Sequence, residues 1–156
     1  TIETEDPEPE RYKQLSLKGM RALVAEDNEL NMEIVKFILE EQGLIVEPAV
    51  DGIEAVRKFE NAPPGYYQVI LMDIMMPNMN GWDAARKIRA MQRADAGVIP
   101  IIAMSANAFT EDIINSRISG MNRHLTKPLD ASKLLDEIAK AVSILPGSAQ
   151  SVHQEK

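Results

Sequence analysis

The chain has 156 residues, a formal net charge of −7 at pH 7 and no cysteine. This length fits one domain, and 45% hydrophobic residues are enough to form a buried core. The acidic balance argues against a protein that holds nucleic acid by neutralising its phosphates. Without cysteine there is no disulfide framework or thiolate zinc site, and the two histidines exclude a multi-histidine metal centre. No apolar stretch is long enough to cross a bilayer.

The two ends of the sequence differ in composition from its middle. Residues 1–10 hold five acidic side chains, two prolines and no basic side chain, a composition that cannot bury apolar surface. We predict an extended or disordered linker over residues 1–19, a folded domain over residues 20–145 and a flexible tail over residues 146–156. The absence of both an initiator methionine and a signal peptide favours a cytoplasmic segment of a longer protein.

The first half of the middle region contains alternating strand and helix patterns. Residues 22–25 form a continuous apolar run, which predicts a strand covered on both faces. A helix should follow, with one apolar face made of Leu30, Ile34, Val35, Ile38 and Leu39. We then expect a weaker strand at residues 45–50, a helix at residues 53–59 and a buried strand at residues 69–72.

The second half continues this alternation. We expect a helix at residues 82–91, a strand at residues 98–104, a helix at residues 108–118 and a weaker strand at residues 123–126. Asp130 is placed to cap a final helix, whose apolar face consists of Leu134, Leu135, Ile138, Ala139 and Val142. Five strand–helix repeats with right-handed crossovers predict an α/β fold: a five-stranded parallel sheet, doubly wound as (βα)5 and flavodoxin-like.

The residues that follow the predicted strands carry most of the candidate chemistry. Ligands of such sheets bind outside the carboxyl ends of the strands, near the point where the strand order reverses. At these ends the sequence has Glu26, Asp27, Asp73, Ser105 and Lys127. One rim of the sheet should therefore gather three carboxylates, a hydroxyl and an ammonium group. Each residue alone also fits a helix cap or a surface charge, but their agreement favours a site.

This set of groups favours a metal-assisted reaction of a phosphoryl group. Three neighbouring carboxylates repel each other, and a divalent cation relieves that repulsion. Oxygen ligands without histidine or cysteine select Mg²⁺, Mn²⁺ or Ca²⁺, and a site that keeps several waters favours Mg²⁺. A carboxylate beside the cation can attack phosphorus and form an acyl phosphate. Lys127 and Ser105 would hold the remaining phosphoryl oxygens.

Five sequence elements, in order, closely resemble the receiver domain of two-component response regulators. They are VAEDN at 24–28, DGIEA at 51–55, MDIMMPNMNG at 72–81, IIAMSA at 101–106 and LTKP at 125–128. The resemblance covers residues 20–144 and is strongest to receivers attached to hybrid histidine kinases. It implies that Asp73 accepts the phosphoryl group. It also implies that Asp27 and Asp73 ligate Mg²⁺ directly, or Mn²⁺ in its place, with Glu26 acting through water and Met75 through its backbone carbonyl.

The same resemblance assigns roles to other residues of the rim. Lys127 would pair with a phosphoryl oxygen, and its bond to Pro128 would be cis. Ser105 would move toward the new phosphate and signal its presence. Asn107 and Met75 occupy the positions that tune the lifetime of the phosphate in the family.

The sequence departs from the family at His124, where receivers usually have a tyrosine or phenylalanine that switches its rotamer. An imidazole can still swing, and protonation at about pH 6–7 can bias it. The alternative is a solvated histidine without a switching role. His124 therefore remains a candidate switch residue together with Ser105.

These features predict a phosphoacceptor domain that takes its phosphoryl group from a phosphohistidine on a histidine kinase or a histidine phosphotransfer protein. Asn28, Asn31 and Ile34 are candidate contacts for that partner, and neither nucleic acid nor a membrane is expected to bind this segment. We expect a segment of a hybrid histidine kinase, which can itself be membrane-anchored; a stand-alone regulator is the alternative.

Two other classes of function are disfavoured by the sequence. A metal-dependent phosphatase generally has a second carboxylate two residues after its nucleophile, where this chain has Met75. A pseudo-receiver that only docks should lack part of the acid and lysine set, which is complete here. Any catalysis by this domain is therefore expected to be limited to its own phosphorylation and dephosphorylation.

Overall fold

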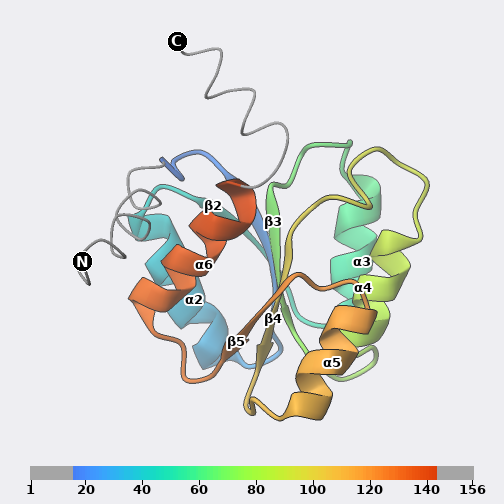
Figure 1. Ribbon diagram of the computed structural model, residues 1–156. Helices are drawn as coiled ribbons and strands as arrows, with labels where there is room; N and C mark the ends of the chain where they lie inside the picture. Colours follow the sequence, from blue (N-terminus) through green and yellow to red (C-terminus); the bar gives the residue numbers. More distant parts are fainter. Residues whose placement is uncertain (1–15, 144–156) are drawn as a thin grey trace, which may run out of the picture.

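A parallel five-stranded sheet is the centre of residues 16–143, the part of the chain described by this computed structural model (Figure 1). In chain order the elements are β1 (Arg21–Ala25), α2 (Glu29–Glu41), β2 (Ile45–Ala49), α3 (Gly52–Asn61), β3 (Val69–Asp73), α4 (Gly81–Arg89), β4 (Ile101–Ser105), α5 (Thr110–Ile118), β5 (Arg123–Thr126) and α6 (Ala131–Ser143). The predicted α/β fold with five strand–helix repeats is confirmed. Within residues 16–143, every helix is too short or too polar to span a lipid bilayer.

The strand order β2-β1-β3-β4-β5 determines where a ligand can bind. From β1 the chain passes to β2 on one side, and it then returns to β3 on the other side. Connections that leave β1 and β3 in opposite directions open a crevice at the carboxyl ends of these strands. In the register of the sheet Ala25 pairs with Met72, so the residue that follows each of them lies at this crevice.

Two apolar cores cover the faces of the sheet, and the central strand contributes to both. All five residues of β3 are buried. Ile70 and Met72 pack in the core beneath α3 and α4, whereas Leu71 packs in the core beneath α2 and α6. Figure 1 shows α2 and α6 on one face of the sheet and α3, α4 and α5 on the other. Burial on both faces explains why the strand sequences are continuous apolar runs.

Helix α5 has few apolar contacts with the rest of the protein. Ser116 is its one buried residue, and Ile118 is 73% exposed. Polar side chains of α4 hold it instead: Trp82 Nε1 donates to Ser116 Oγ at 3.0 Å, and Arg86 donates to Ser119 Oγ at 2.9 Å. A helix held mainly by hydrogen bonds can shift at a lower free-energy cost than one held by a packed core.

The predicted apolar face of α2 is only partly correct. Val35 and Leu39 are buried together with Met32, but Leu30 and Ile34 are 69% and 43% exposed. Hydrophobic residues four apart lie on one side of a helix, yet their spacing does not say whether that side meets the sheet or the solvent. In α2 this pair is on the solvent side.

Two predicted boundaries also differ from the structure. Val98, the expected start of a strand, is exposed, and β4 begins after Pro100, which has no N–H for the sheet. Leu17 is buried and Gly19 N donates to Gly43 O at 2.8 Å, so the packed chain begins earlier than the predicted boundary at residue 20. The rest of the predicted linker, residues 1–15, and the predicted tail, residues 146–156, lie outside the described residues.

Candidate functional site

Three carboxylates meet at the carboxyl ends of β1 and β3. Glu26 and Asp27 follow β1 directly, and Asp73 is the last residue of β3. Each of the three offers an oxygen atom, and these atoms all lie within 4.8 Å of one another. Glu26 and Asp73 are buried, at 2% and 4% exposure, whereas Asp27 is open to solvent. The sheet register therefore brings two buried acids and one accessible acid to one point.

Lys127 supplies the positive charge of this cluster. It follows β5, and its peptide bond to Pro128 is cis. Its Nζ lies 3.1 Å from Asp73 Oδ2, to which it donates a hydrogen bond, and 2.9 Å from Glu26 Oε1 in an ion pair. One ammonium group is thus shared between two buried carboxylates.

The electrostatics of the cluster reflect this shortage of positive charge. Burial, and after it the charge of Glu26, raises the pKa of the Asp73 carboxyl to about 6, against the opposing effect of Lys127. Burial by itself would lower the pKa of Lys127, but its hydrogen bonds and ion pairs with Glu26 and Asp73 outweigh it, and the pKa is raised. The protein thus holds negative charge where solvent does not stabilise it.

The donor set fits a hard divalent cation. All three acidic side chains offer oxygen atoms, no sulfur or imidazole is part of the cluster, and a cation would relieve the repulsion between Glu26 and Asp73. The side chain of Met75, two residues after Asp73, is 72% exposed. The assignment of its backbone carbonyl as a further ligand stays a prediction.

Ser105 and His124 form a hydrogen-bonded pair beside the carboxylates. Ser105 ends β4, and its hydroxyl donates to the carbonyl of Asn107. His124 lies on the neighbouring strand β5, with Nε2 2.8 Å from Ser105 Oγ. His124 Nδ1 is buried and has no hydrogen-bond partner within residues 16–143.

The comparison with known families agrees with this geometry. Residues 22–139 match the response regulator receiver domain. The chain belongs to this family. Among relatives it is 35% identical, over 130 residues, to the peroxide stress-activated histidine kinase mak1 of Schizosaccharomyces pombe. It is also 32% identical, over 126 residues, to the sensory/regulatory protein RpfC of Xanthomonas campestris.

These relatives are much longer than this receiver domain. The match covers 83% of this chain and 8% of mak1, and 79% of this chain and 16% of RpfC. A solved structure of similar size is the receiver domain of the sensor histidine kinase PA1611 from Pseudomonas aeruginosa, which has a magnesium ion coordinated in the active site cleft. It is 35% identical, with a TM-score of 0.73, and the alignment covers 80% of this chain and 98% of that one.

Sequence reasoning missed one pair of residues next to the site of this receiver domain. Asp51 was seen only as part of a family motif, and Asn78 was not singled out. In the structure Asn78 Nδ2 donates to Asp51 Oδ2 at 2.7 Å, which joins the loop after β3 to the start of α3. An aspartate before a glycine at a strand end indicates a helix cap, but no sequence pattern indicates a partner 27 residues away.

Proposed function

We propose that this receiver domain accepts a phosphoryl group on Asp73 from a phosphohistidine, with Mg²⁺ bound beside it. The observation that carries the proposal is the meeting of Asp73, Glu26 and Asp27 at the switch point of the sheet with a single lysine. A site for hydrolysis of external phosphate esters would need a second acid near the leaving group. The side chain two residues after Asp73 is Met75.

In this proposal Asp27, Asp73 and the carbonyl of Met75 hold the cation directly, and Glu26 holds it through water. Bound there, Mg²⁺ withdraws charge from the phosphoryl oxygens and offsets the charge of the carboxylates. Mn²⁺ has the same preference for oxygen ligands and should replace it. The receiver domain of PA1611, which has magnesium in its active site cleft, supports this choice of metal.

The chemical step is an in-line transfer between two nucleophiles. An oxygen of Asp73 attacks phosphorus, the new O–P bond forms and the N–P bond of the phosphohistidine breaks. The imidazole leaves with the electron pair of that bond and is reprotonated from solvent, so no other reactant is needed. Lys127, already 3.1 Å from Asp73 Oδ2, is placed to turn to a phosphoryl oxygen and balance its charge.

The response to phosphorylation would start at Ser105. A phosphoryl group on Asp73 carries about −1.5 to −2 charge in place of the single charge of the carboxylate, and it brings new acceptor oxygens. To donate to one of them, the Ser105 hydroxyl must release Asn107, and it then no longer holds His124 in place. The segment between Ser105 and α5 is thereby biased to a second state. Asn107 and Met75 would set how readily water reaches the phosphate.

The His124 part of this proposal can be tested by NMR. In His124→Ala the labelling of Asp73 should be unchanged, while the chemical-shift changes of α5 amides on phosphorylation should become smaller. The matched variant His124→Phe, which restores an aromatic ring, should recover part of the change. Equal shift changes in the wild type and His124→Ala would instead support a solvated histidine without a switching role.

The solvent side of α2 supports a helical, phosphohistidine-bearing partner. Leu30, Ile34 and Phe37 are 69%, 43% and 65% exposed and lie on one side of the helix. Ile34 and Asn31 also line a small hollow with Lys127, so the apolar strip reaches the rim that holds Asp73. An amphipathic helix laid along this strip would bring its histidine to the rim.

Transfer from a phosphorylated histidine phosphotransfer domain tests both acceptor and docking. Ile34→Asp should slow this transfer by about tenfold or more, since it puts a charge in an apolar contact. The same variant should accept phosphate from the small donor phosphoramidate at the wild-type rate. Equal transfer rates from the protein donor would remove α2 from the docking surface and leave the acceptor assignment intact.

The relatives further suggest the context of this domain. We infer that it belongs to a hybrid histidine kinase, as the matched segments of mak1 and RpfC belong to longer proteins whose names are those of a histidine kinase and a sensory protein. In that arrangement the receiver would lie in the cytoplasm, where the kinase makes its phosphohistidine. The kinase activity would belong to other parts of that protein.

A further inference from the structure

The loop between β3 and α4, residues 74–80, is attached to the start of α3 by two neighbouring hydrogen bonds. Asn78 Nδ2 donates to Asp51 Oδ2 at 2.7 Å, and Gly52 N donates to Met79 O at 3.1 Å. The loop begins directly after Asp73 and contains Met75. At the start of the loop, Ile74 N donates to Met104 O at 2.9 Å and Ile74 O accepts from Gly81 N at 2.8 Å, so the two contacts with α3 restrain its second half.

Asp51 is held firmly enough to act as an anchor. It is 9% exposed, and its other oxygen, Oδ1, accepts the backbone N–H of Glu54 at 2.8 Å as the cap of α3. The hydrogen bonds from Glu54 and Asn78 lower the pKa of the Asp51 carboxyl, so it is ionised at neutral pH. A hydrogen bond to a charged, part-buried carboxylate is stronger than one between neutral groups.

The loop also fits closely against the residues around it. Asn78 has a φ of 69°, a left-handed conformation that asparagine tolerates better than most residues. A Cβ atom added at Gly52 would lie 2.4 Å from Met79 O, and one added at Gly81 would lie 2.3 Å from Asp73 O. Backbone therefore meets backbone at both contacts, and the loop has little room to take another path.

We propose that Asp51 and Asn78 are positioning residues that hold the 74–80 loop in the conformation required for metal binding beside Asp73. This inference rests on the proposed function. Holding the loop in advance spares the entropy of ordering it when the cation binds, and it fixes the direction of the Met75 carbonyl. Loss of such an outer contact typically weakens metal affinity by about tenfold or more.

The test is calorimetric titration of the full chain with Mg²⁺, without phosphodonor. Asn78→Asp faces two carboxylates toward each other and should weaken the Mg²⁺ Kd by about tenfold. Asp51→Asn removes the charge of the acceptor, but one of the two amides can turn its oxygen to the other's N–H, so this variant should weaken the Kd less. The double variant D51N/N78D restores one donor and one acceptor. It keeps an oxygen to cap α3, and its Kd should return to within about threefold of wild type.

Asp95→Asn is the matched control. Asp95 is also a part-buried aspartate that accepts a backbone N–H, from Gly65 at 2.9 Å, and a side-chain hydrogen bond, from Arg93 at 2.7 Å. It precedes β4 and so lies at the opposite end of the parallel sheet from Asp73. The variant Asp95→Asn should therefore lower the thermal midpoint while leaving the Mg²⁺ Kd unchanged.

The outcomes separate this inference from the proposed function. Weak binding by Asn78→Asp with recovery in the double variant supports the positioning role. Wild-type affinity in Asn78→Asp, or no recovery in the double variant when its thermal midpoint is normal, overturns it. If the wild type itself binds no Mg²⁺, the proposed function is overturned, and the positioning role with it.

Discussion

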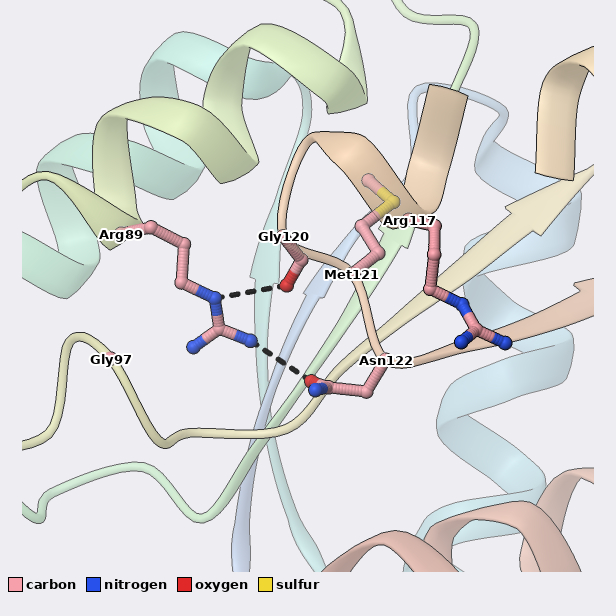
Figure 2. A pocket seen from close by; sticks show the side chains of 6 residues that line it. All are labelled: Arg89, Gly97, Arg117, Gly120, Met121 and Asn122. Carbon is pink, nitrogen blue, oxygen red and sulfur yellow. Dashed lines mark hydrogen bonds between the residues drawn. The ribbon is translucent and has the colours of Figure 1, made fainter. Parts of the chain in front are cut away.

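The two ends of the parallel sheet treat buried charge in opposite ways. At the carboxyl end, Glu26 and Asp73 share the single ammonium group of Lys127. At the other end, the part-buried guanidinium of Arg89 donates to Gly120 O, Ala96 O and Asn122 Oδ1, each at 2.9 Å. Figure 2 shows the bonds to Gly120 and Asn122. At the first end two buried negative charges share one positive charge, so one of them is not balanced. At the second end one buried positive charge has three neutral hydrogen-bond acceptors.

The degree to which a buried charge is compensated distinguishes a binding site from a contact that only stabilises the fold. Burial disfavours charge at both ends: it raises the pKa of Asp73 and lowers that of Arg89. Arg89 is compensated by two backbone carbonyls and the side-chain oxygen of Asn122, and it ties α4 to the turn that follows α5 (Figure 2). The negative charge of Asp73 is only partly compensated by Lys127, so binding of a cation there is favourable. Three substitutions sharpen the contrast.

Removing the shared ammonium should have the largest effect. Lys127→Met keeps most of the apolar stem but leaves two buried carboxylates without a counter-charge. Breaking a buried pair in this way typically costs about 3–5 kcal/mol of unfolding free energy. Urea unfolding at pH 7 without metal should show this loss, and saturating Mg²⁺ should restore part of it. An unchanged urea midpoint without metal would contradict the view that Lys127 balances both acids.

Removing one of the two acids should raise the unfolding free energy, the opposite of the effect of removing Lys127. The pKa of Asp73 is about 6 in the native protein against an ordinary 3.8, so the native state binds more protons than the unfolded state between these values. The unfolding free energy of the metal-free wild type should therefore fall as pH rises from about 4 to about 6. Asp73→Asn lacks this titration. It should be more stable at pH 7 by up to about 3 kcal/mol, and this advantage should vanish below about pH 4.

A pH series of urea unfolding curves, measured with a chelator, checks this prediction. An advantage of Asp73→Asn that is equal at pH 4 and pH 7 would show that proton binding by Asp73 is not its cause. Since a protonated carboxyl is a poor ligand, Mg²⁺ affinity of the wild type should also weaken as pH falls through about 6.

Changing the opposite end should affect stability alone. Lysine has one nitrogen at its tip and cannot reach three acceptors at once, so Arg89→Lys should lose about 2 kcal/mol of unfolding free energy. Lys87→Ala, at an exposed position of the same helix, is the control and should change stability much less. Neither variant should alter the Mg²⁺ Kd. A weaker Kd in Arg89→Lys would mean that the two ends are coupled.

The sequence was most informative where one physical cause dominates. Strand β3 is buried on both faces, so its residues are uniformly apolar and Asp73 stands out at its end. The alternation of elements predicted the sheet, and strand ends predicted that Glu26, Asp27, Asp73 and Lys127 would meet. This part of the fold and site needs only local patterns plus the right-handed crossover.

The sequence was least informative where partners are distant or absent. Leu30 and Ile34 have the spacing of a core face, but they are exposed, because the same periodicity serves a surface that can meet another protein. The hydrogen bond between Asp51 and Asn78 depends on the path of a loop that no periodicity describes. The hydrogen bond between His124 and Ser105 depends on the pairing of β5 with β4, which is a matter of tertiary structure.

Mass spectrometry after incubation with phosphoramidate, with and without Mg²⁺, tests the central claim most directly. The wild type should gain one phosphoryl group, removable by hydroxylamine and mapped to Asp73, only when Mg²⁺ is present, and Asp73→Asn should gain none. Labelling of Asp73→Asn at the wild-type rate, or no labelling of the wild type under any condition, would contradict it.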